Sequence, residues 1–159
     1  MPSAENRWVN DYDQPLNFVC SERASINYIS SVHSNSKEDR VWDFTCRTTF
    51  QQSPTCYWTN YVNEFDEAFS FTCPLDGVIN GLSSYHDNHR EDRRWKFHCC
   101  SLKNICNSQC YWTGYVNEFD EHLSFAVPEG YVLTGMSSYH DNKKEDRRWM
   151  YNYCSQRSC

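Results

Sequence analysis

Three segments of the chain carry nearly the same set of residues that can bind or react. They read SSVHSNSKEDRVWDFTC from Ser30, SSYHDNHREDRRWKFHC from Ser83 and SSYHDNKKEDRRWMYNYC from Ser137, so they begin 53 and then 54 residues apart. Carboxylate, guanidinium, imidazole, amide and indole groups at this density suit two kinds of chemistry. They can form an internal brace of ion pairs and stacked rings, or they can bind a polar ligand such as a sugar through many hydrogen bonds.

Both interpretations apply to parts of the repeated segment. The brace assigns Glu91, Asp92, Arg93 and Trp95, with their counterparts, to bidentate carboxylate–guanidinium bonds beside a strand. The polar residues ahead of them have no apolar neighbours in the sequence, so we expect them in a loop that contacts a sugar or a sulfated glycan. The candidates from this segment are His86, Asp87, Asn88, Glu91, Arg93, His140, Asp141, Asn142, Glu145 and Arg147, with the first-unit counterparts His33 and Asn35.

A second repeated segment reads CYWTNYVNEFDE and CYWTGYVNEFDE, and it places Trp58 and Trp112 two residues after a cysteine. These rings could cap the core. The first unit has Glu5 at the aligned position, however, which favours two pockets in which Trp58 and Trp112 stack on sugar rings.

Enzymatic chemistry fits the pattern poorly. Glycoside hydrolysis needs two carboxylates held about 5 to 9 Å apart, and pairs such as Glu64 with Asp66 recur in other units. Binding sites are often repeated within a small domain because multivalency multiplies weak affinities, whereas catalytic sites seldom are. No phosphate-binding loop, nucleophile elbow or zincin motif occurs. We therefore expect no enzyme and no cofactor.

The oxygen-rich stretch DNHRED raises the question of calcium. His89 and Arg90 interrupt it, and Lys143 and Lys144 do so in the third unit. Cationic side chains oppose a divalent ion, so we expect no metal site and calcium-independent binding.

Composition narrows the class of partner. The net charge is −6, which leaves no basic stripe for a phosphate backbone and excludes nucleic acid. No apolar run is long enough to enter a membrane. Ten cysteines in 159 residues are typical of a secreted protein. The start MPSAENRWVN lacks an apolar signal segment, so we expect a mature secreted chain with an added Met1.

The repeats predict an all-β fold. Aligning the chain with itself gives units at about residues 3–53, 56–107 and 110–159 of a single domain. Alternating runs such as LSFAV and RRWKFHC indicate strands, the segments CPLDG and VPEG indicate turns, and HDNHRED indicates a loop. We expect three sheets of short strands about a pseudo-threefold axis, as in a β-prism, with a β-trefoil as the alternative.

The same alignment pairs the cysteines. Cys20 and Cys46 match Cys73 and Cys99, and both are replaced in the third unit, by Val127 and Tyr153. The pair Cys56 and Cys100 matches Cys110 and Cys154, and both are replaced in the first unit, by Ser3 and Arg47. Residues that disappear together are predicted to be bonded to each other. The predicted disulfides are Cys20–Cys46, Cys73–Cys99, Cys56–Cys100, Cys110–Cys154 and, from the remaining two, Cys106–Cys159.

The run from Asp92 to Cys99 resembles the Asp-Arg-x-Trp-x-aromatic-x-Cys signature of the dermatopontin family, and it recurs at Asp39–Cys46 and Asp146–Tyr153. The resemblance covers the whole chain and is strongest to the invertebrate branch of haemagglutinins and amebocyte aggregation factors. Arg94 and Arg148 depart from vertebrate members, which usually carry Glu or Gln there. The resemblance implies either a lectin or a matrix-adhesion protein that binds proteoglycans and matrix proteins.

The predicted function is therefore a secreted lectin or haemagglutinin that cross-links cells or matrix. Its expected partners are cell-surface or matrix glycans, including sulfated glycosaminoglycans. The alternative is an extracellular-matrix adhesion protein that binds proteoglycan or matrix proteins, with repeats that are purely structural. The sugar, the homo-oligomeric state and sulfation of Tyr12 are left open.

Overall fold

The computed structural model describes residues 8–159, so the aligned residues Ser3 and Glu5 and the start of the first unit lie outside the described part. Every regular element in this part is a β-strand, which confirms the all-β prediction. No helix that could cross a membrane occurs among these residues. The strands are β1 (Leu16–Val19), β2 (Ala24–Ser34), β3 (Asp39–Thr48), β4 (Thr55–Trp58), β5 (Phe69–Thr72), β6 (Val78–Asp87), β7 (Asp92–Ser101), β8 (Ile105–Trp112), β9 (Leu123–Ala126), β10 (Val132–Asp141) and β11 (Asp146–Ser158).

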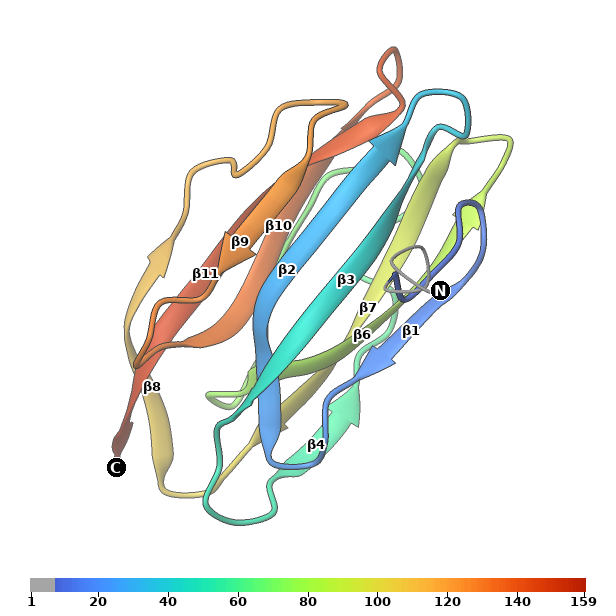
Figure 1. Cartoon of the computed structure of the whole chain (residues 1–159). Helices are drawn as coiled ribbons and strands as arrows, with labels where there is room; N and C mark the ends of the chain where they lie inside the picture. The colour runs from blue at the N-terminus through green and yellow to red at the C-terminus, as the bar shows by residue number, and fades with distance from the viewer. Residues whose placement is uncertain (1–7) are drawn as a thin grey trace, which may run out of the picture.

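Three long hairpins, one from each unit, form the frame of the molecule. They are β2–β3, β6–β7 and β10–β11, and their turns gather at the upper end in Figure 1. Each hairpin is the centre of its own sheet, with the strand orders β3-β2-β9, β1-β6-β7-β4 and β5-β10-β11-β8. Three sheets of three or four strands are compatible with the expected prism, although the hairpin strands are longer than expected.

In each sheet, one short edge strand comes from the preceding unit, with the third unit counted as preceding the first. β1 of the first unit pairs with β6 of the second, β5 of the second with β10 of the third, and β9 of the third with β2 of the first. The exchange closes on itself, so every unit is hydrogen-bonded to both others. One edge of each hairpin is consequently covered only by a strand of another unit.

The core is centred on three equivalent tryptophans. Trp42, Trp95 and Trp149 are almost fully buried and pack edge to face in a closed triangle, with ring centroids 5.1 to 5.4 Å apart. Edge-to-face contact is the favoured geometry for aromatic pairs, because the positive edge of one ring meets the negative face of the next.

The recurring Val-Asn pair holds each loop against its hairpin. Asn63 donates from its Nδ2 to the carbonyl of Arg93 (3.0 Å) and accepts the backbone N–H of Trp95 (2.9 Å). Asn10 and Asn117 make the same pair of bonds in their own units. A buried side-chain amide that satisfies both backbone groups explains why asparagine recurs at this position.

Five disulfides crosslink the chain, and they join the same partners as the self-alignment indicates: Cys20–Cys46, Cys73–Cys99, Cys56–Cys100, Cys110–Cys154 and Cys106–Cys159. The last two bridges span 44 and 53 residues of sequence. Loops of this length are stabilised by about 4 kcal/mol each in the chain-entropy description of crosslinks.

Candidate functional site

The repeated acidic and basic residues of this segment form a closed ring of ion pairs around the tryptophans. Arg93 donates from Nε and Nη2 to both carboxylate oxygens of Asp39, at 2.9 and 2.8 Å. The other two pairs are Arg147 with Asp92 and Arg40 with Asp146, each at 2.8 Å. The brace interpretation is therefore met for Asp and Arg, but every pair joins two different units rather than two residues of one segment.

The histidines of the segment lie inside this assembly. β6 continues through Asp87 and β7 begins at Asp92, so the expected loop is shorter and His86 belongs to a strand. The His86 side chain is only 1% exposed: its Nδ1 lies 3.3 Å from Asp13 Oδ1, and its Nε2 lies 3.4 Å from the carbonyl of Glu38. His33 and His140 occupy the same position in their units. The ring nitrogens of these histidines already contact protein oxygens, so a sugar would have to displace those oxygens to bind the histidines.

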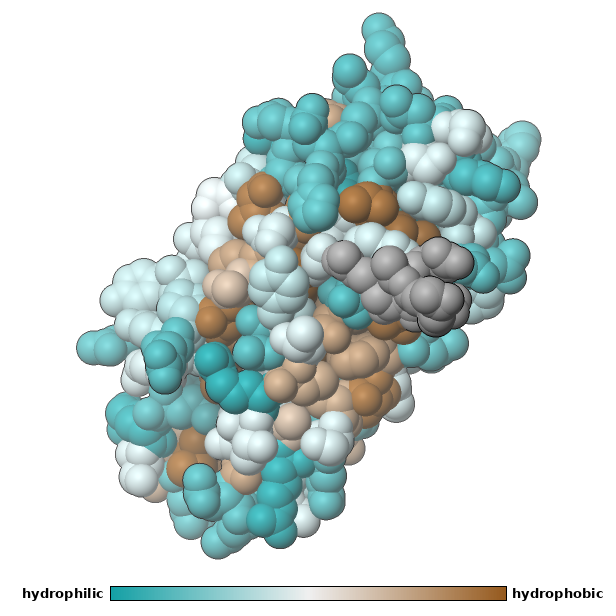
Figure 2. Space-filling model, viewed as in Figure 1, coloured by the Kyte–Doolittle hydropathy of each residue, from teal (hydrophilic) through white to brown (hydrophobic). Residues whose placement is uncertain are grey.

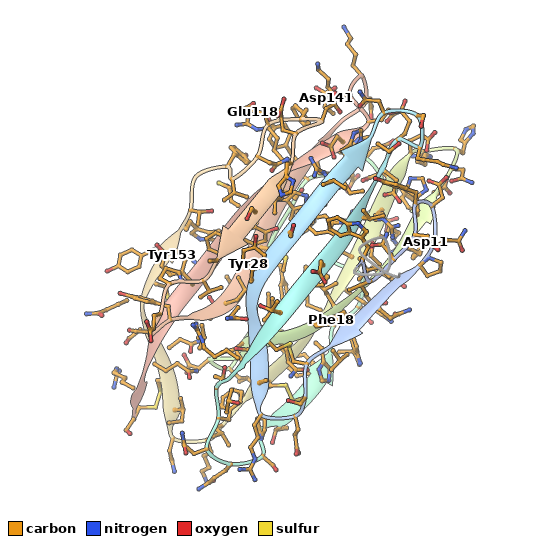
Figure 3. The ribbon with its side chains drawn as sticks, viewed as in Figure 1. Asp11, Phe18, Tyr28, Glu118, Asp141 and Tyr153 are labelled. Carbon is orange, nitrogen blue, oxygen red and sulfur yellow. A yellow bond between two sulfur atoms is a disulfide. The ribbon has the colours of Figure 1, made fainter. Side chains whose placement is uncertain are left out.

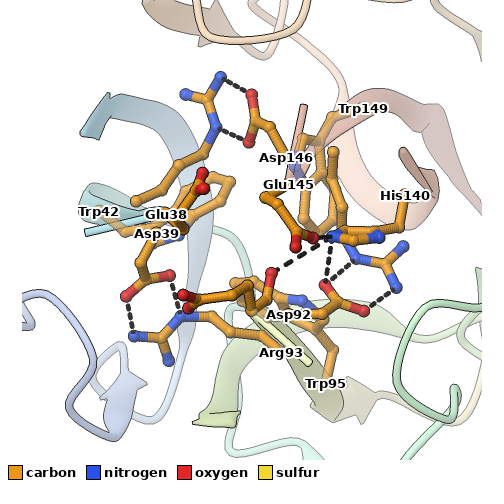
Figure 4. Close-up of a pocket in the computed structure, with 13 residues that line it drawn as sticks. Glu38, Asp39, Trp42, Asp92, Arg93, Trp95, His140, Glu145, Asp146 and Trp149 are labelled. Carbon is orange, nitrogen blue, oxygen red and sulfur yellow. Dashed lines mark hydrogen bonds and ion pairs between the residues drawn. The ribbon is translucent and has the colours of Figure 1, made fainter. Parts of the chain in front are cut away.

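A narrow pocket with a volume of about 30 Å³ opens above the tryptophans, between the three ion pairs. Glu38, Glu91 and Glu145 line it, and Figure 4 shows Glu38 and Glu145 on opposite sides of the space. Burial raises the pKa of Glu91 and Glu145; nearby histidine lowers it by less, and neighbouring carboxylates add to the increase. Three carboxylates facing one space repel anions, so this pocket does not suit a sulfated glycan.

Carboxylates and a histidine also come together at three equivalent positions, one of which is Asp13, Asp39 and His86. A cation there would have to share the Asp39 carboxylate, whose two oxygens are bonded to Arg93. A guanidinium at 2.8 Å supplies the charge that a metal ion would otherwise supply. A further group contains Cys56, His98 and Cys100, but both cysteines are in a disulfide and offer no thiolate.

Asp87, Asn88 and their third-unit counterparts shape the hairpin turns. Asp87 Oδ1 accepts the backbone N–H groups of His89 (2.8 Å) and Arg90 (2.9 Å), and the bond from Arg90 is the main cause that lowers the pKa of Asp87. Asn88 Oδ1 lies 3.0 Å from His86 Nδ1. Asp141 and Asn142 repeat both arrangements, and Asn35 is exposed in the first-unit turn. These turns end in a strongly hydrophilic surface (Figure 2).

The exposed aromatic residues form a different kind of surface on the second and third units. In the second unit, Trp58 is 41% exposed, and the guanidinium of Arg94 lies over Tyr61 at 4.7 Å while donating to the hydroxyl of Tyr85 at 2.8 Å. Glu64 Oε2 lies 3.6 Å from Arg94. We define the second-unit platform as Trp58, Tyr61, Glu64, Tyr85, Arg94 and Lys96.

The third unit repeats this surface. Trp112 is 41% exposed, and Arg148 lies 4.3 Å above Tyr115 and donates to the hydroxyl of Tyr139 at 2.9 Å. Glu118, at the upper end of the molecule in Figure 3, lies 3.4 Å from Arg148. We define the third-unit platform as Trp112, Tyr115, Glu118, Tyr139, Arg148 and Met150. The first unit has Val32 and Val41 in place of the tyrosine and arginine, and Val41 is buried.

Sequence reasoning thus selected the two exposed tryptophans but not the tyrosines beside them. Tyr61 and Tyr85 are 24 residues apart in sequence, yet their rings lie 5.2 Å apart. The available signal was that both recur in the third unit, as Tyr115 and Tyr139, and are missing from the first.

Comparison with known proteins identifies the family. The family model described as Dermatopontin matches residues 10–159, which is nearly the whole chain. The chain belongs to the dermatopontin family. It is 53% identical over 154 residues to the hemagglutinin/amebocyte aggregation factor of Limulus polyphemus, covering 96% of this chain and 89% of that protein.

Two other proteins to which the chain is similar differ from it more. The dermatopontin of Biomphalaria glabrata is 37% identical over 147 residues, covering 92% of this chain and 99% of its own length. Millepora cytotoxin-1 of Millepora dichotoma is 39% identical over 146 residues, which cover 92% of this chain and 65% of that protein. No solved structure matches the chain. The dermatopontin and hemagglutinin families are binding and adhesion proteins rather than enzymes.

Proposed function

We propose that the protein is a secreted, glycan-binding agglutinin that cross-links cells or matrix through its two platforms. The observation that carries the proposal is the presence of two equivalent exposed surfaces, each with a tryptophan and an arginine held over tyrosine, on one disulfide-bonded body. The name of the Limulus relative, a hemagglutinin and aggregation factor, agrees with it.

The platform chemistry suits a sugar. An exposed indole face offers apolar area to the C–H groups of a sugar ring, while the neighbouring tyrosine and charged groups offer hydrogen bonds to hydroxyls. Arg94 is fixed by Tyr85 and by the carbonyl of Asn63 at 3.1 Å, so little side-chain entropy is lost when a ligand binds. The turn residues Asp87, Asn88, Asp141 and Asn142 stay in the proposal as accessory contacts, whereas the buried Arg93 and Arg147 hold the frame.

Two weak sites are sufficient for cross-linking. A single platform with millimolar affinity contributes about 4 kcal/mol. When several platforms engage one surface, the effective concentration can strengthen attachment by about 10² or more. A body held by five disulfides keeps the two platforms at a fixed separation, which allows them to reach glycans on different cells.

Alanine at both exposed tryptophans, Trp58→Ala with Trp112→Ala, is expected to abolish agglutination. Each single variant should raise the minimal agglutinating concentration by about 10-fold or more, since a protein with one platform cannot bridge two cells unless it self-associates. The matched control is Leu75→Ala, because Leu75 is 78% exposed and lies outside both platforms. Titration of cell agglutination gives the result, and full activity of the double variant would contradict the proposal.

Chelation of divalent ions is expected to leave agglutination unchanged, because arginines already neutralise the buried carboxylates at the axis. The measurement compares agglutination titres with EDTA and with added calcium, at constant ionic strength. A loss with EDTA that calcium alone restores would show that binding is metal-dependent.

A second candidate function, adhesion to matrix proteins, is favoured by a tyrosine cluster on the third sheet. Tyr111, Tyr131 and Tyr153 lie with ring centroids 5.3 to 6.3 Å apart, Tyr111 is 50% exposed, and Figure 3 shows Tyr153 projecting outward. Tyrosine is enriched at protein interfaces. Retention on immobilised matrix proteins that is lost in Tyr111→Ser, but not in the tryptophan double variant, would support this function.

Extracellular location belongs to the same proposal. All ten cysteines are in disulfides, and such bridges form and persist in oxidising compartments. Expression with a secretion signal should therefore give the bridged protein, which peptide mapping without reduction would verify.

A further inference from the structure

The two platforms share their geometry but not their charge. Trp58 pairs across the sheet with His98, and Trp112 pairs with Asn152. Two residues before these partners, and therefore on the same face of the strand, stand Lys96 in the second unit and Met150 in the third. The repeat thus places an ammonium group and a thioether at matched positions.

Lys96 is held where a ligand on the platform would meet it. Its Nζ lies 5.7 Å from the ring centre of Trp58 and 5.1 Å from that of Tyr61, which are cation–π distances. Among the described residues, no carboxylate lies within ion-pair distance of Lys96, whereas Arg94 has Glu64 at 3.6 Å. The ammonium group is therefore positioned by two rings and keeps its hydrogen-bond donors for another acceptor.

The two platforms differ by one unit of charge. Arg94, Lys96 and Glu64 sum to +1 in the second-unit platform, while Arg148 and Glu118 sum to zero in the third. Burial lowers the pKa of His98, so this imidazole is neutral at physiological pH and adds no charge. The whole protein has a net charge of −6. An anion that binds at the second-unit platform would nevertheless meet a local excess of one positive charge.

We propose that the two platforms bind different classes of sugar: the second-unit platform takes an anionic sugar, whose sulfate or carboxylate group meets Lys96, and the third-unit platform takes a neutral one. This inference rests on the proposed glycan-binding function and assigns a ligand class to each site. A protein with one anionic and one neutral site would join unlike glycans, for example a sulfated matrix chain and a neutral cell-surface glycan.

The repeat provides the test. Lys96→Met and Met150→Lys exchange residues that the fold already holds at matched positions, so both variants should remain folded. The probes are a heparin hexasaccharide, a hyaluronan hexasaccharide, which carries carboxylates without sulfate, and maltohexaose as a neutral hexasaccharide. Isothermal titration calorimetry at low and at physiological salt gives affinity and stoichiometry.

Lys96→Met is expected to weaken binding of the anionic probe by about 10-fold, which is the effect of one charge-assisted hydrogen bond, and to remove most of its salt dependence. Its affinity for the neutral probe at the third-unit platform should not change, and the altered second-unit platform should add a second site for the neutral probe. Met150→Lys should raise the stoichiometry of the anionic probe from one to two. The heparin and hyaluronan arms show whether sulfate or carboxylate is the preferred anion.

Unchanged binding of both anionic probes by Lys96→Met would overturn the inference, as would a Met150→Lys variant that gains no anionic site. The tryptophan double variant distinguishes a failure of the charge assignment from a failure of the proposed glycan binding. If it loses all glycan binding while Lys96→Met behaves as wild type, only the charge assignment fails. If the wild-type protein binds none of the three probes and retains no immobilised glycan, the proposed function fails as well.

Discussion

Methionine in place of Arg93 is expected to lower the free energy of unfolding by about 3 to 5 kcal/mol. Arg93 is 3% exposed, and its guanidinium also donates to the carbonyl of Gln14 at 2.7 Å. Removing it leaves the Asp39 carboxylate, which is equally buried, without its charged partner. An uncompensated buried charge is more costly than the loss of the hydrogen bonds alone.

Arg94→Met is the matched control, because the side chain of the neighbouring Arg94 is partly exposed and pairs with the exposed Glu64. An exposed ion pair contributes about 0 to 1 kcal/mol, and Arg94 also donates to Tyr85 and to the carbonyl of Asn63. This variant should therefore lose clearly less stability than Arg93→Met, because it leaves no buried charge unpaired. Denaturant unfolding with the disulfides intact, followed by circular dichroism, measures both. Adding Asp39→Asn to Arg93→Met should restore part of the loss, since it removes the buried charge. A change below about 1 kcal/mol for Arg93→Met would show that the ring does not hold the units together.

Alanine in place of Trp95 is expected to destabilise the fold by a similar amount, about 3 to 5 kcal/mol. Trp95 is 2% exposed and contacts both other tryptophans of the triangle. The variant loses the burial of a large ring and two edge-to-face contacts, each of which adds about 0.5 to 1.5 kcal/mol. The cavity lies on the axis shared by all three sheets, where no single unit can close it.

Trp58→Ala provides the comparison for Trp95→Ala, because Trp58 is 41% exposed. It should reduce agglutination while leaving the denaturation midpoint nearly unchanged, whereas Trp95→Ala should shift the midpoint strongly. Unfolding is best followed by far-ultraviolet circular dichroism, since both substitutions alter tryptophan fluorescence. Equal midpoints for the two variants would contradict the central role of the triangle.

The amino-acid sequence by itself determined the repeat, the all-β class and the disulfide partners. Each of these follows from comparing equivalent positions within one chain. Cys20 and Cys46 are matched by Cys73 and Cys99 and are both replaced in the third unit. A lone cysteine would leave a reactive thiol, so the members of a bridge tend to be kept or lost together, and the sequence records this.

The surface role of the exposed tryptophans could also be predicted from the sequence. Trp58 and Trp112 follow a bridged cysteine at the end of a short strand, and the first unit has no tryptophan there. A core residue required by the threefold frame would be expected in all three units, as Trp42, Trp95 and Trp149 are. Presence in only two units therefore pointed to a surface role.

Only the tertiary structure decided which residues meet across units. The sequence predicted that His86 lies in an open loop. It did not decide whether Arg93 belongs to an internal brace or to a binding site. In the fold, His86 reaches Asp13 and Arg93 reaches Asp39, both in the preceding unit. Periodicity identifies equivalent positions but not their partners, because the exchanged strands β1, β5 and β9 bring each unit's loop against the next hairpin. The physical reason is that a single unit cannot cover its own hairpin edge or bury its own ions, so these contacts exist only when all three units are assembled.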